Sequence, residues 1–357
     1  MMISSYCFGF TPWKRKQVKR FFPDEVLYFC KDLAHAKRLG LDDVSRVYIW
    51  GKKQFDEVVS YAKAHRISVF RIEDGFIRSV TLGSDLTKAY SLVVDSRGIY
   101  FDPTQESDLE YMLNTYHFDD ALLKRAQRLQ TYLVEEKLSK YNIQKDQVLQ
   151  FSEASGKQVI CVPGQVEDDA SIIYGGEGMR NVELLEAVRV NCPDAFIVYK
   201  PHPDVVAGNR KGMVRSDEAL HYADVIIEDV SLPSLIASCD AVHTITSLSG
   251  FEALLRGKEV HTYGMPFYAG WGLTHDHKVC QRRKRRRSLL ELVAAVYILY
   301  PRYLDPKTSA LCDVEVVLEA IKEEKSRYNN SFIYRNVVHI RNYVLRKLHL
   351  VWRLFVA

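Results

Sequence analysis

The sequence lacks long hydrophobic runs, a signal-like start and any regular cysteine pattern. No stretch reaches the roughly 18 consecutive apolar residues of a membrane-spanning helix. Residues 1–10 lack a basic segment followed by a long apolar one. The seven cysteines include no C-x-x-C pair. Because they lack the spacing of a disulfide framework or a zinc site, we expect buried thiols in a reducing compartment and a cytoplasmic protein.

Acidic residues are missing from two parts of the chain that are rich in Lys and Arg. Residues 282–287 read R-R-K-R-R-R, and residues 325–357 hold seven Lys or Arg and no Asp or Glu. Since the formal net charge is only +4, the remainder is net acidic and would repel a nucleic-acid backbone. No aromatic-rich basic platform accompanies the runs, so we do not expect nucleic-acid binding. Runs of this kind are more often solvated or membrane-facing.

The chain has 357 residues, of which 47% are hydrophobic, enough for two domains with separate cores. Short β-rich runs alternate with helical stretches, which predicts α/β domains built on parallel sheets. A hairpin is predicted from residues 90–95 and 99–101. The other predicted strands are 6–10, 26–29, 47–50, 69–72, 159–162, 195–199, 225–227, 241–245 and, as the last strand, 260–263. The predicted helices include 14–20, 33–39, 54–65, 108–116, 119–138 and 181–191.

Carboxylates follow two of the predicted strands. Glu73 and Asp74 come after one strand, and Glu167, Asp168 and Asp169 come after another. Ligands of open α/β sheets bind beyond the carboxyl ends of the strands. Clustered carboxylates repel one another, so one interpretation is a catalytic carboxylate whose neighbours tune it. The other is a solvated acidic turn.

Two further strand ends carry groups suited to an anion. Lys200 and His202 follow a strand, and the prolines on both sides of the histidine fix its backbone, which favours a phosphate contact. Ser247 and Ser249 lie at a strand-to-helix turn. Hydroxyls and backbone N–H groups at such a turn suit a phosphate, but they also serve as ordinary helix caps. Both interpretations of the serines stay open.

Two segments are rich in glycine. Residues 175–178 lack the spacing of a phosphate-binding loop, so they are predicted to form a flexible turn. Residues 264–272 combine glycines with aromatic residues. Such a loop could seal a ligand cleft, or its aromatic rings could simply pack in the core.

Five segments of the sequence can be compared with known families. They are E-D-G-F-I-R-S (73–79), G-Q-V-E-D-D-A-S (164–171), K-P-H-P-D-V (200–205), T-S-L-S-G-F-E-A-L-L-R-G-K (246–258) and G-M-P-F-Y-A-G-W-G-L-T (264–274). Together they resemble the KpsC-type bacterial β-Kdo glycosyltransferases of capsule and lipopolysaccharide synthesis. The resemblance implies an α/β, GT-B-like fold, in which two Rossmann-like domains face each other across a cleft, and CMP-Kdo as the donor. More distantly, some of the motifs look like those of CMP-sialic acid transferases.

The resemblance also implies roles for individual residues. A β-linked donor that gives a β-linked product requires retention, which two successive inversions through a covalent intermediate can achieve. Asp168 is then the nucleophile and Glu167 its neighbour, although the sequence does not separate Asp168 from Asp169. Glu73 or Asp74 is the acid/base group. The expected nucleotide-binding residues are Gln165, Lys200, His202, Pro203, Asp229, Ser247, Ser249 and Gly250.

Three regions are expected along the chain. Residues 1–150 form an acceptor-side domain, residues 151–290 form the CMP-sugar-binding domain, and residues 291–357 form basic amphipathic helices. A helix of this type can lie on an anionic membrane or pack against a partner. We favour the membrane, and hence a peripheral protein of the inner membrane. The apolar stripe is Ile333, Val337, Ile340, Val344, Leu348, Val351 and Phe355.

The expected partners are CMP-Kdo, a lipid-linked saccharide acceptor and an anionic membrane surface. No cofactor is expected, and no metal, because no cluster in the sequence has ligand spacing for Mg²⁺ or Mn²⁺. A Lys, a His and a helix N-terminus can neutralise the single phosphate of CMP. The alternatives are a CMP-sialic acid-dependent sialyltransferase and a non-catalytic, membrane-bound component of polysaccharide export.

Overall fold

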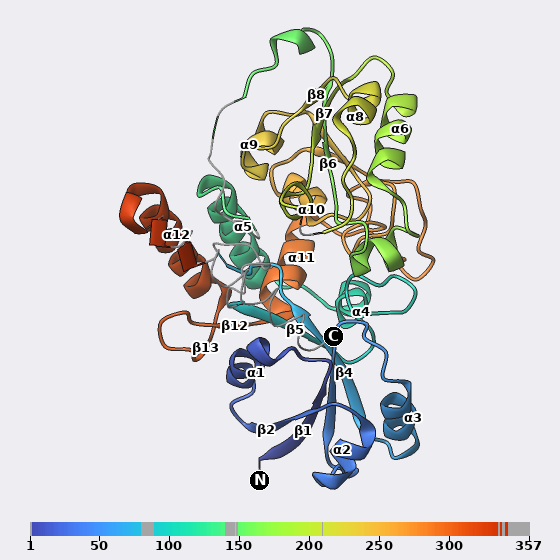
Figure 1. The fold of residues 1–357 in the computed structure, drawn as a ribbon, viewed down its shortest axis with the longest axis vertical. Helices are drawn as coiled ribbons and strands as arrows, with labels where there is room; N and C mark the ends of the chain where they lie inside the picture. Colours follow the sequence, from blue (N-terminus) through green and yellow to red (C-terminus); the bar gives the residue numbers. More distant parts are fainter. Residues whose placement is uncertain are drawn as a thin grey trace. The chain divides into compact units, whose positions relative to one another are not determined.

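The computed structural model describes residues 2–79, 89–139, 147, 149–208, 210–334, 336–337 and 340–341 (Figure 1). Within these residues the chain forms two compact units. The first draws on the segments up to Ile99 and from Val296 onward, and the second on the segments from Tyr100 to Ser139 and from Gln144 to Ala295. The chain therefore leaves the first unit and returns to it.

The first unit contains a seven-stranded sheet in the order β13-β12-β5-β4-β3-β1-β2. Strands β1 to β4 are parallel, whereas β5 runs antiparallel to β4, β12 to β5, and β13 to β12. The strands are β1 (Ile3–Phe8), β2 (Glu25–Cys30), β3 (Arg46–Trp50), β4 (Ser68–Asp74), β5 (Ser91–Asp95), β12 (Pro301–Leu304) and β13 (Leu311–Cys312). The helices are α1 (Pro12–Val18) with the 3₁₀ turn η1 (Lys19–Phe21), α2 (Leu33–Arg38), α3 (Asp56–Ala64) and α12 (Val314–Asn330).

Both faces of this sheet are covered by helices. Because alternate residues of a strand point to opposite faces, one strand contributes to both cores. On β3, Tyr48 and Trp50 pack with residues of α1 and η1, including Phe21. Val47 and Ile49 of the same strand pack with residues of α2 and α3. The sheet is mixed, with three parallel and three antiparallel pairings, and the helices on both faces of its parallel part confirm the predicted α/β class of this unit.

The predicted hairpin after Tyr90 is wrong in its second strand. Residues 91–95 form β5, but residues 99–101 form a turn. The Asp95 carboxylate accepts the N–H groups of Arg97 at 3.0 Å and Gly98 at 2.8 Å, and it also accepts the hydroxyl of Tyr300 at 2.6 Å. Because β5 already pairs with β4 and β12, no edge of it remains for a hairpin partner.

Residues 260–263 are not the last strand. Strand β11 (His275–Asp276) follows them in the second unit, and β12 and β13 then extend the sheet of the first unit. Pro301 lies opposite Val93 in this pairing. A strand that pairs with a partner about 200 residues earlier leaves no local signal in the sequence, which is why it was missed.

The second unit contains a six-stranded sheet in the order β11-β10-β9-β6-β7-β8, and every pairing in it is parallel. Its strands are β6 (Val159–Pro163), β7 (Phe196–Lys200), β8 (Val225–Ile226), β9 (Ala241–Thr244), β10 (Glu259–Thr262) and β11. Its helices are α4 (Asp108–Thr115), α5 (Asp120–Glu135), α6 (Asn181–Asn191), α7 (Pro203–Val206), α8 (Ser216–Tyr222), α9 (Leu232–Ala237), α10 (Leu248–Leu255) and α11 (Leu289–Val293). Shorter turns of helix are Ser152–Ala154 and Ser171–Gly175, and Ala294–Leu299 is the segment where the chain passes back into the first unit.

The five predicted strands of this sheet are confirmed. Ile160 and Ile197, on the neighbouring strands β6 and β7, pack with Leu184 and Val188 of α6 and with Ala219 of α8. The parallel order places the carboxyl ends of β6, β7 and β9 along one edge, where ligands of such sheets bind.

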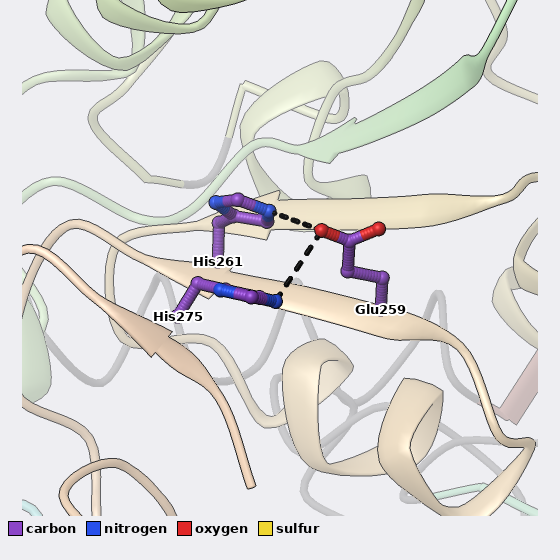
Figure 2. Close-up of side chains that lie close together, drawn as sticks. All are labelled: Glu259, His261 and His275. Carbon is purple, nitrogen blue, oxygen red and sulfur yellow. Dashed lines mark hydrogen bonds and ion pairs between the residues drawn. The ribbon is translucent and has the colours of Figure 1, made fainter. Parts of the chain in front are cut away.

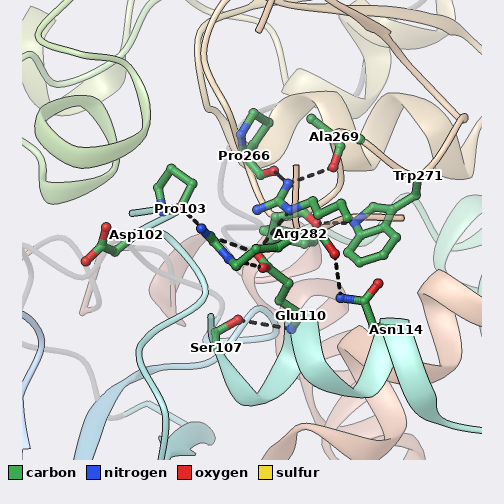
Figure 3. A network of polar contacts seen from close by, with 12 residues as sticks. Asp102, Pro103, Ser107, Glu110, Asn114, Pro266, Ala269, Trp271 and Arg282 are labelled. Carbon is green, nitrogen blue, oxygen red and sulfur yellow. Dashed lines mark hydrogen bonds and ion pairs between the residues drawn. The ribbon is translucent and has the colours of Figure 1, made fainter. Parts of the chain in front are cut away.

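The basic run of residues 282–287 is partly internal, which corrects the expectation of a solvated or membrane-facing segment. Arg282 and Arg283 both bind the carboxylate of Glu110 on α4, at 2.7 and 3.2 Å (Figure 3). Arg287 donates to the carbonyl of Leu113 on the same helix at 2.6 Å. At least three of the six charges therefore serve to pack α4.

The C-terminal stripe lies mostly outside the described residues. Ile333, Val337 and Ile340 are described, and their side chains are exposed. Val344, Leu348, Val351 and Phe355 lie outside the described residues. In the part of the chain that the structure describes, no helix is both long enough and apolar enough to span a bilayer.

Four of the cysteines are buried, as predicted. All seven, each within the described residues, carry free thiols. Cys7, Cys30, Cys161 and Cys239 are buried. The other three are partly exposed.

Candidate functional site

Gln165 connects two strand ends of the second unit. It follows β6, and its buried amide group reaches the turn after β9. The amide NH₂ donates to the Thr246 hydroxyl at 3.1 Å, and the amide oxygen accepts the Thr246 N–H at 2.9 Å and the Thr244 hydroxyl at 3.3 Å. Because both ends of the amide are engaged, Gln165 positions this turn.

Asn181 holds the backbone of Gln165 from the other side. Its side chain accepts the Gln165 N–H at 2.8 Å and donates to the Gln165 carbonyl at 2.8 Å. It also donates to the carbonyl of Gly212 at 2.8 Å. Asn181 is 1% exposed, so its polar atoms must find partners inside the protein. Our sequence analysis missed this residue, although an Asn at the start of an apolar helix is a signal of such a role.

The acidic loop after β6 divides into three distinct environments. One Glu167 oxygen accepts the N–H of Asn181, at the N-terminus of α6, at 2.8 Å. Asp169 accepts the N–H and hydroxyl of Ser171 at 3.0 and 2.8 Å, so it caps the next helical turn. Asp168 is exposed and pairs with Arg210 at 3.0 Å. Glu167 and Asp169 thus accept backbone N–H groups, whereas Asp168 accepts none from the described residues.

Arg210 is a second residue that the sequence analysis missed. It lies in the polar loop after α7, and both its Nε and its Nη2 approach one oxygen of Asp168, at 3.2 and 3.0 Å. The sequence around it, G-N-R-K-G, is that of an ordinary exposed loop. No local pattern marks Arg210, because its partner lies 42 residues away.

Lys200 lies at the end of β7 and is buried, with 4% of the residue exposed. Its ammonium group donates to the carbonyl of Glu228 at 2.9 Å. Burial lowers the pKa of Lys200, and the charges of Asp229 and Glu228 act in the opposite direction. Lys200 and the acidic residues after β8 therefore lie close enough for their charges to interact.

His202 caps the short helix α7, whose first residue is Pro203. Its Nδ1 accepts the N–H of Asp204 at 3.1 Å. An accepting Nδ1 carries no proton, so the matching neutral tautomer has its proton on Nε2. The close approach of this segment to β6 needs a glycine, because a Cβ on Gly164 would lie 2.9 Å from the Tyr199 hydroxyl and 3.3 Å from the His202 nitrogen.

The two serines before and within α10 form a local cap. The Ser247 hydroxyl accepts the Ser249 N–H at 3.1 Å, and the two hydroxyl oxygens lie 2.7 Å apart. Tyr268 donates to the Ser247 carbonyl, and Gly250 leaves the space that its ring occupies. Ordinary capping is therefore present here, while the N-terminal turn of α10 still belongs to the same edge as Lys200.

The glycine-rich segment 175–178 contains the predicted turn at residues 177–178, whereas Gly175 and Gly176 before it are buried. Ser171–Gly175 is helical. A Cβ on Gly175 would lie 3.1 Å from Thr246 and one on Gly176 would lie 2.7 Å from Ile245. These glycines let the chain pack closely against the turn that Gln165 holds.

The aromatic loop 264–272 packs rather than standing open. Phe267, Tyr268 and Trp271 are all buried, and the Trp271 indole donates to the Phe267 carbonyl at 2.9 Å. Of the two interpretations left open by the sequence, the structure shows the packing one for these three side chains.

The carboxylate pair of the first unit is also asymmetric. Glu73 and Asp74 are the last residues of β4, not residues of the following loop. Lys14 lies 3.3 Å from Asp74, and the buried Arg78 lies 2.9 Å from it. Lys14 in turn sits 3.5 Å above the ring of Trp50. Asp74 is thereby bound by two cations, and one Glu73 oxygen accepts the N–H of Asp74 at 2.9 Å.

Known proteins match both the sequence and the fold. Residues 45–303 match a family described as capsule polysaccharide biosynthesis protein. Capsule polysaccharide modification protein LipA of Neisseria meningitidis serogroup A is 45% identical over 334 residues, which cover 92% of this chain and 47% of LipA. The chain thus spans about half the length of that relative. Lipopolysaccharide-processing protein LpsZ of Rhizobium meliloti is 38% identical over 326 residues, which cover 89% of this chain and 74% of LpsZ.

Two solved structures of KpsC from Thermosulfurimonas dismutans share the fold. The one described as a beta Kdo 2,7 transferase is 36% identical with a TM-score of 0.72, and the match covers 90% of this chain and 99% of that one. The one described as a beta Kdo 2,4 transferase is 34% identical with a TM-score of 0.77, covering 90% and 98%. With a family match over most of its length and relatives at these identities, the chain belongs to the capsule polysaccharide biosynthesis protein family.

Proposed function

We propose that this chain is a glycosyltransferase that moves Kdo from CMP-β-Kdo to a saccharide acceptor during synthesis of a bacterial surface polysaccharide. The observation that carries the proposal is the match to both KpsC Kdo transferase structures over nearly their whole lengths, at 36% and 34% identity. The two α/β units are compatible with a GT-B-like enzyme. The proposal is also supported by the charged side chains near strand ends, Lys200 and Asp168 in the second unit and Glu73 in the first.

The donor nucleotide is assigned to the second unit. Lys200 supplies a buried positive charge, and the N-terminus of α10 at Ser247 supplies backbone N–H groups for a phosphate. Asp229 is assigned to the ribose, whose hydroxyls its carboxylate would accept as hydrogen-bond donors. Gln165 and Gly250 act by shaping the turn and not by direct contact, because their surroundings are filled by Thr246 and Tyr268.

The chemical step is proposed to be a double displacement with retention. One oxygen of Asp168 attacks the anomeric carbon of Kdo, the bond to the CMP phosphate breaks, and CMP leaves with the electron pair. An acceptor hydroxyl then attacks the same carbon, its proton passes to a carboxylate base, and Asp168 is released. Asp168 is preferred over Asp169 because Asp169 is committed to Ser171, and Glu73 is preferred over Asp74 as the base because two cations bind Asp74.

No metal is required by this scheme. The leaving group carries one phosphate, and a lysine, a histidine and a helix terminus can stabilise its charge. The acceptor is proposed to be a lipid-linked saccharide, which would place the enzyme at the cytoplasmic face of the inner membrane.

The test is to incubate the purified chain with CMP-Kdo or CMP-sialic acid, each with synthetic Kdo-terminated acceptors. We expect a product one Kdo heavier, with a β linkage in its NMR spectrum, and the same rate in EDTA. Transfer from CMP-sialic acid alone would instead identify a sialyltransferase. Release of no CMP from either donor would favour a non-catalytic role and would overturn the proposal.

A further inference from the structure

Three histidines form a row across one end of the second sheet. His243 on β9, His261 on β10 and His275 on β11 are in register in neighbouring parallel strands. Their rings stack, with centroids 4.0 Å apart for the first pair and 4.6 Å for the second. The row runs from the buried His243 to the exposed edge strand. None of these residues has a part in the proposed transfer reaction.

A carboxylate completes the group at the exposed end of the row. Glu259 precedes His261 by two residues on β10, so both side chains point to the same face. One Glu259 oxygen lies 2.9 Å from Nε2 of His261 and 3.4 Å from Nε2 of His275 (Figure 2). The three ligand atoms all lie within 4.8 Å of one another.

These separations are those of ligand atoms around a metal ion. Zn²⁺ binds imidazole nitrogens and carboxylate oxygens at about 2.1 Å, so neighbouring ligands of a tetrahedral site are about 3.4 Å apart. Two imidazoles and one carboxylate favour a first-row transition metal over Mg²⁺ or Ca²⁺, which prefer oxygen ligands. We propose that Glu259, His261 and His275 bind one Zn²⁺ ion, with solvent as the remaining ligand.

Neighbouring side chains hold the ligands in place. His243 stacks on His261, and its Nδ1 lies 3.3 Å from the Tyr263 hydroxyl, which also accepts a hydrogen bond from Asn191 at 3.3 Å. The stacked ring of His243 limits the orientations open to the His261 ring.

The ion would have a structural role. The three ligands lie on β10 and β11, whereas Gln165 and Lys200 follow β6 and β7, so β9 separates the metal from these proposed donor residues in the strand order. Strand β11 has only two residues, and it connects the aromatic loop 264–272 to the arginines that bind Glu110. A metal bridge between β10 and β11 would hold this short edge strand in the sheet.

The test uses the full chain, stripped of metal with EDTA and dialysed into chelator-free buffer. We expect one equivalent of Zn²⁺ to bind in titration calorimetry and the melting temperature to rise when Zn²⁺ is added. Substitution by Co²⁺ should give the visible absorption bands of a tetrahedral site. His275→Ala and Glu259→Gln should each weaken Zn²⁺ binding at least about tenfold and remove the thermal shift.

His221→Ala is the matched control, because His221 is an exposed histidine of α8 outside the group, and it should bind Zn²⁺ as the parent chain does. Unchanged Zn²⁺ affinity in both ligand variants, or no Zn²⁺ binding by the parent chain, would overturn the proposal. The readout does not depend on glycosyl transfer, so its failure and that of the proposed enzyme activity can be told apart.

Discussion

The guanidinium of Arg283 lies 3.2 Å from the carboxylate of Glu110, and the two side chains are only 3% and 4% exposed. Arg283 also donates to the carbonyls of Pro266 and Ala269, at 2.5 and 2.7 Å. Burial lowers the pKa of Arg283, and the charge of Glu110 opposes that shift. The pair links α4 to the segment after β11, and the two carbonyl contacts of Arg283 extend this link to the loop after β10.

Glu110→Gln should strongly destabilise the second unit. The substitution keeps the shape of the side chain but leaves a buried guanidinium without its counter-charge, which costs about 3–5 kcal/mol. Urea unfolding followed by tryptophan fluorescence would measure the loss. Lys307→Ala is the control, because it removes an exposed ion pair with Glu323, and it should give no measurable change. Equal stability of the Glu110 variant and the parent chain would show that the pair contributes little.

Asp168→Asn should abolish transfer while CMP-Kdo still binds. An amide cannot form the covalent ester with the sugar, whereas the donor phosphate is assigned to other residues. Rapid quenching of the parent enzyme should trap a peptide containing residues 165–171 that is heavier by one Kdo, and the variant should lack it. Asp169→Asn serves as the matched control, since an Asn can still accept the hydrogen bonds of Ser171 and turnover should stay near normal. An adduct that maps elsewhere would remove Asp168 from the role.

Glu73→Gln and Asp74→Asn should fail in different ways. Asp74 is bound by Lys14 and Arg78, so its loss leaves two cations unbalanced and should lower the melting temperature as well as the activity. Glu73→Gln should lower kcat by 100-fold or more, the usual scale for a lost acid/base group, with little change in melting temperature. The measurements are kcat and the melting temperature of both variants. If Asp74→Asn lowers kcat without lowering the melting temperature and Glu73→Gln lowers the melting temperature, the acid/base role belongs to Asp74.

Lys200→Met should weaken donor binding but stabilise the fold at neutral pH. The lowered pKa of Lys200 means that the folded chain holds this proton less tightly than the unfolded chain does. The cost of the buried charge is therefore present below the folded pKa, and it shrinks as the pH rises towards the ordinary value of 10.5. We expect the variant to be about 1 kcal/mol more stable at pH 7, with the difference narrowing at alkaline pH. A less stable variant with unaltered CMP affinity would argue for a purely structural lysine.

Deletion of residues 331–357 should release the chain from anionic vesicles. Ile333, Val337 and Ile340 expose apolar surface, and the segment carries no acidic residue, so it suits an anionic interface. Cosedimentation with phosphatidylglycerol vesicles, compared with neutral phosphatidylcholine vesicles, measures the effect. If the truncated chain sediments as the full chain does, the segment packs against a partner instead.

The secondary structure was largely predictable because its signals are local. Apolar runs such as residues 159–162 and 195–199 mark buried parallel strands, and caps such as Ser231 and Ser247 mark helix starts within three residues. The rule that ligands bind at strand ends then directed attention to residues 165–168 and Lys200. Because these signals are local, the sequence identified the edge of the second sheet where a ligand would bind, but it did not identify the side-chain contacts there.

The partners of each charged side chain were decided only by the tertiary structure. The sequence did not show that Asp169 caps a turn, that Asp74 is bound by two cations, or that Arg282 reaches Glu110 across 172 residues. Nor did it place His261 and His275, 14 residues apart, side by side in neighbouring strands. Strands and caps depend on residues a few positions apart, whereas ion pairs and ligand sets depend on which distant segments the fold brings within about 4 Å.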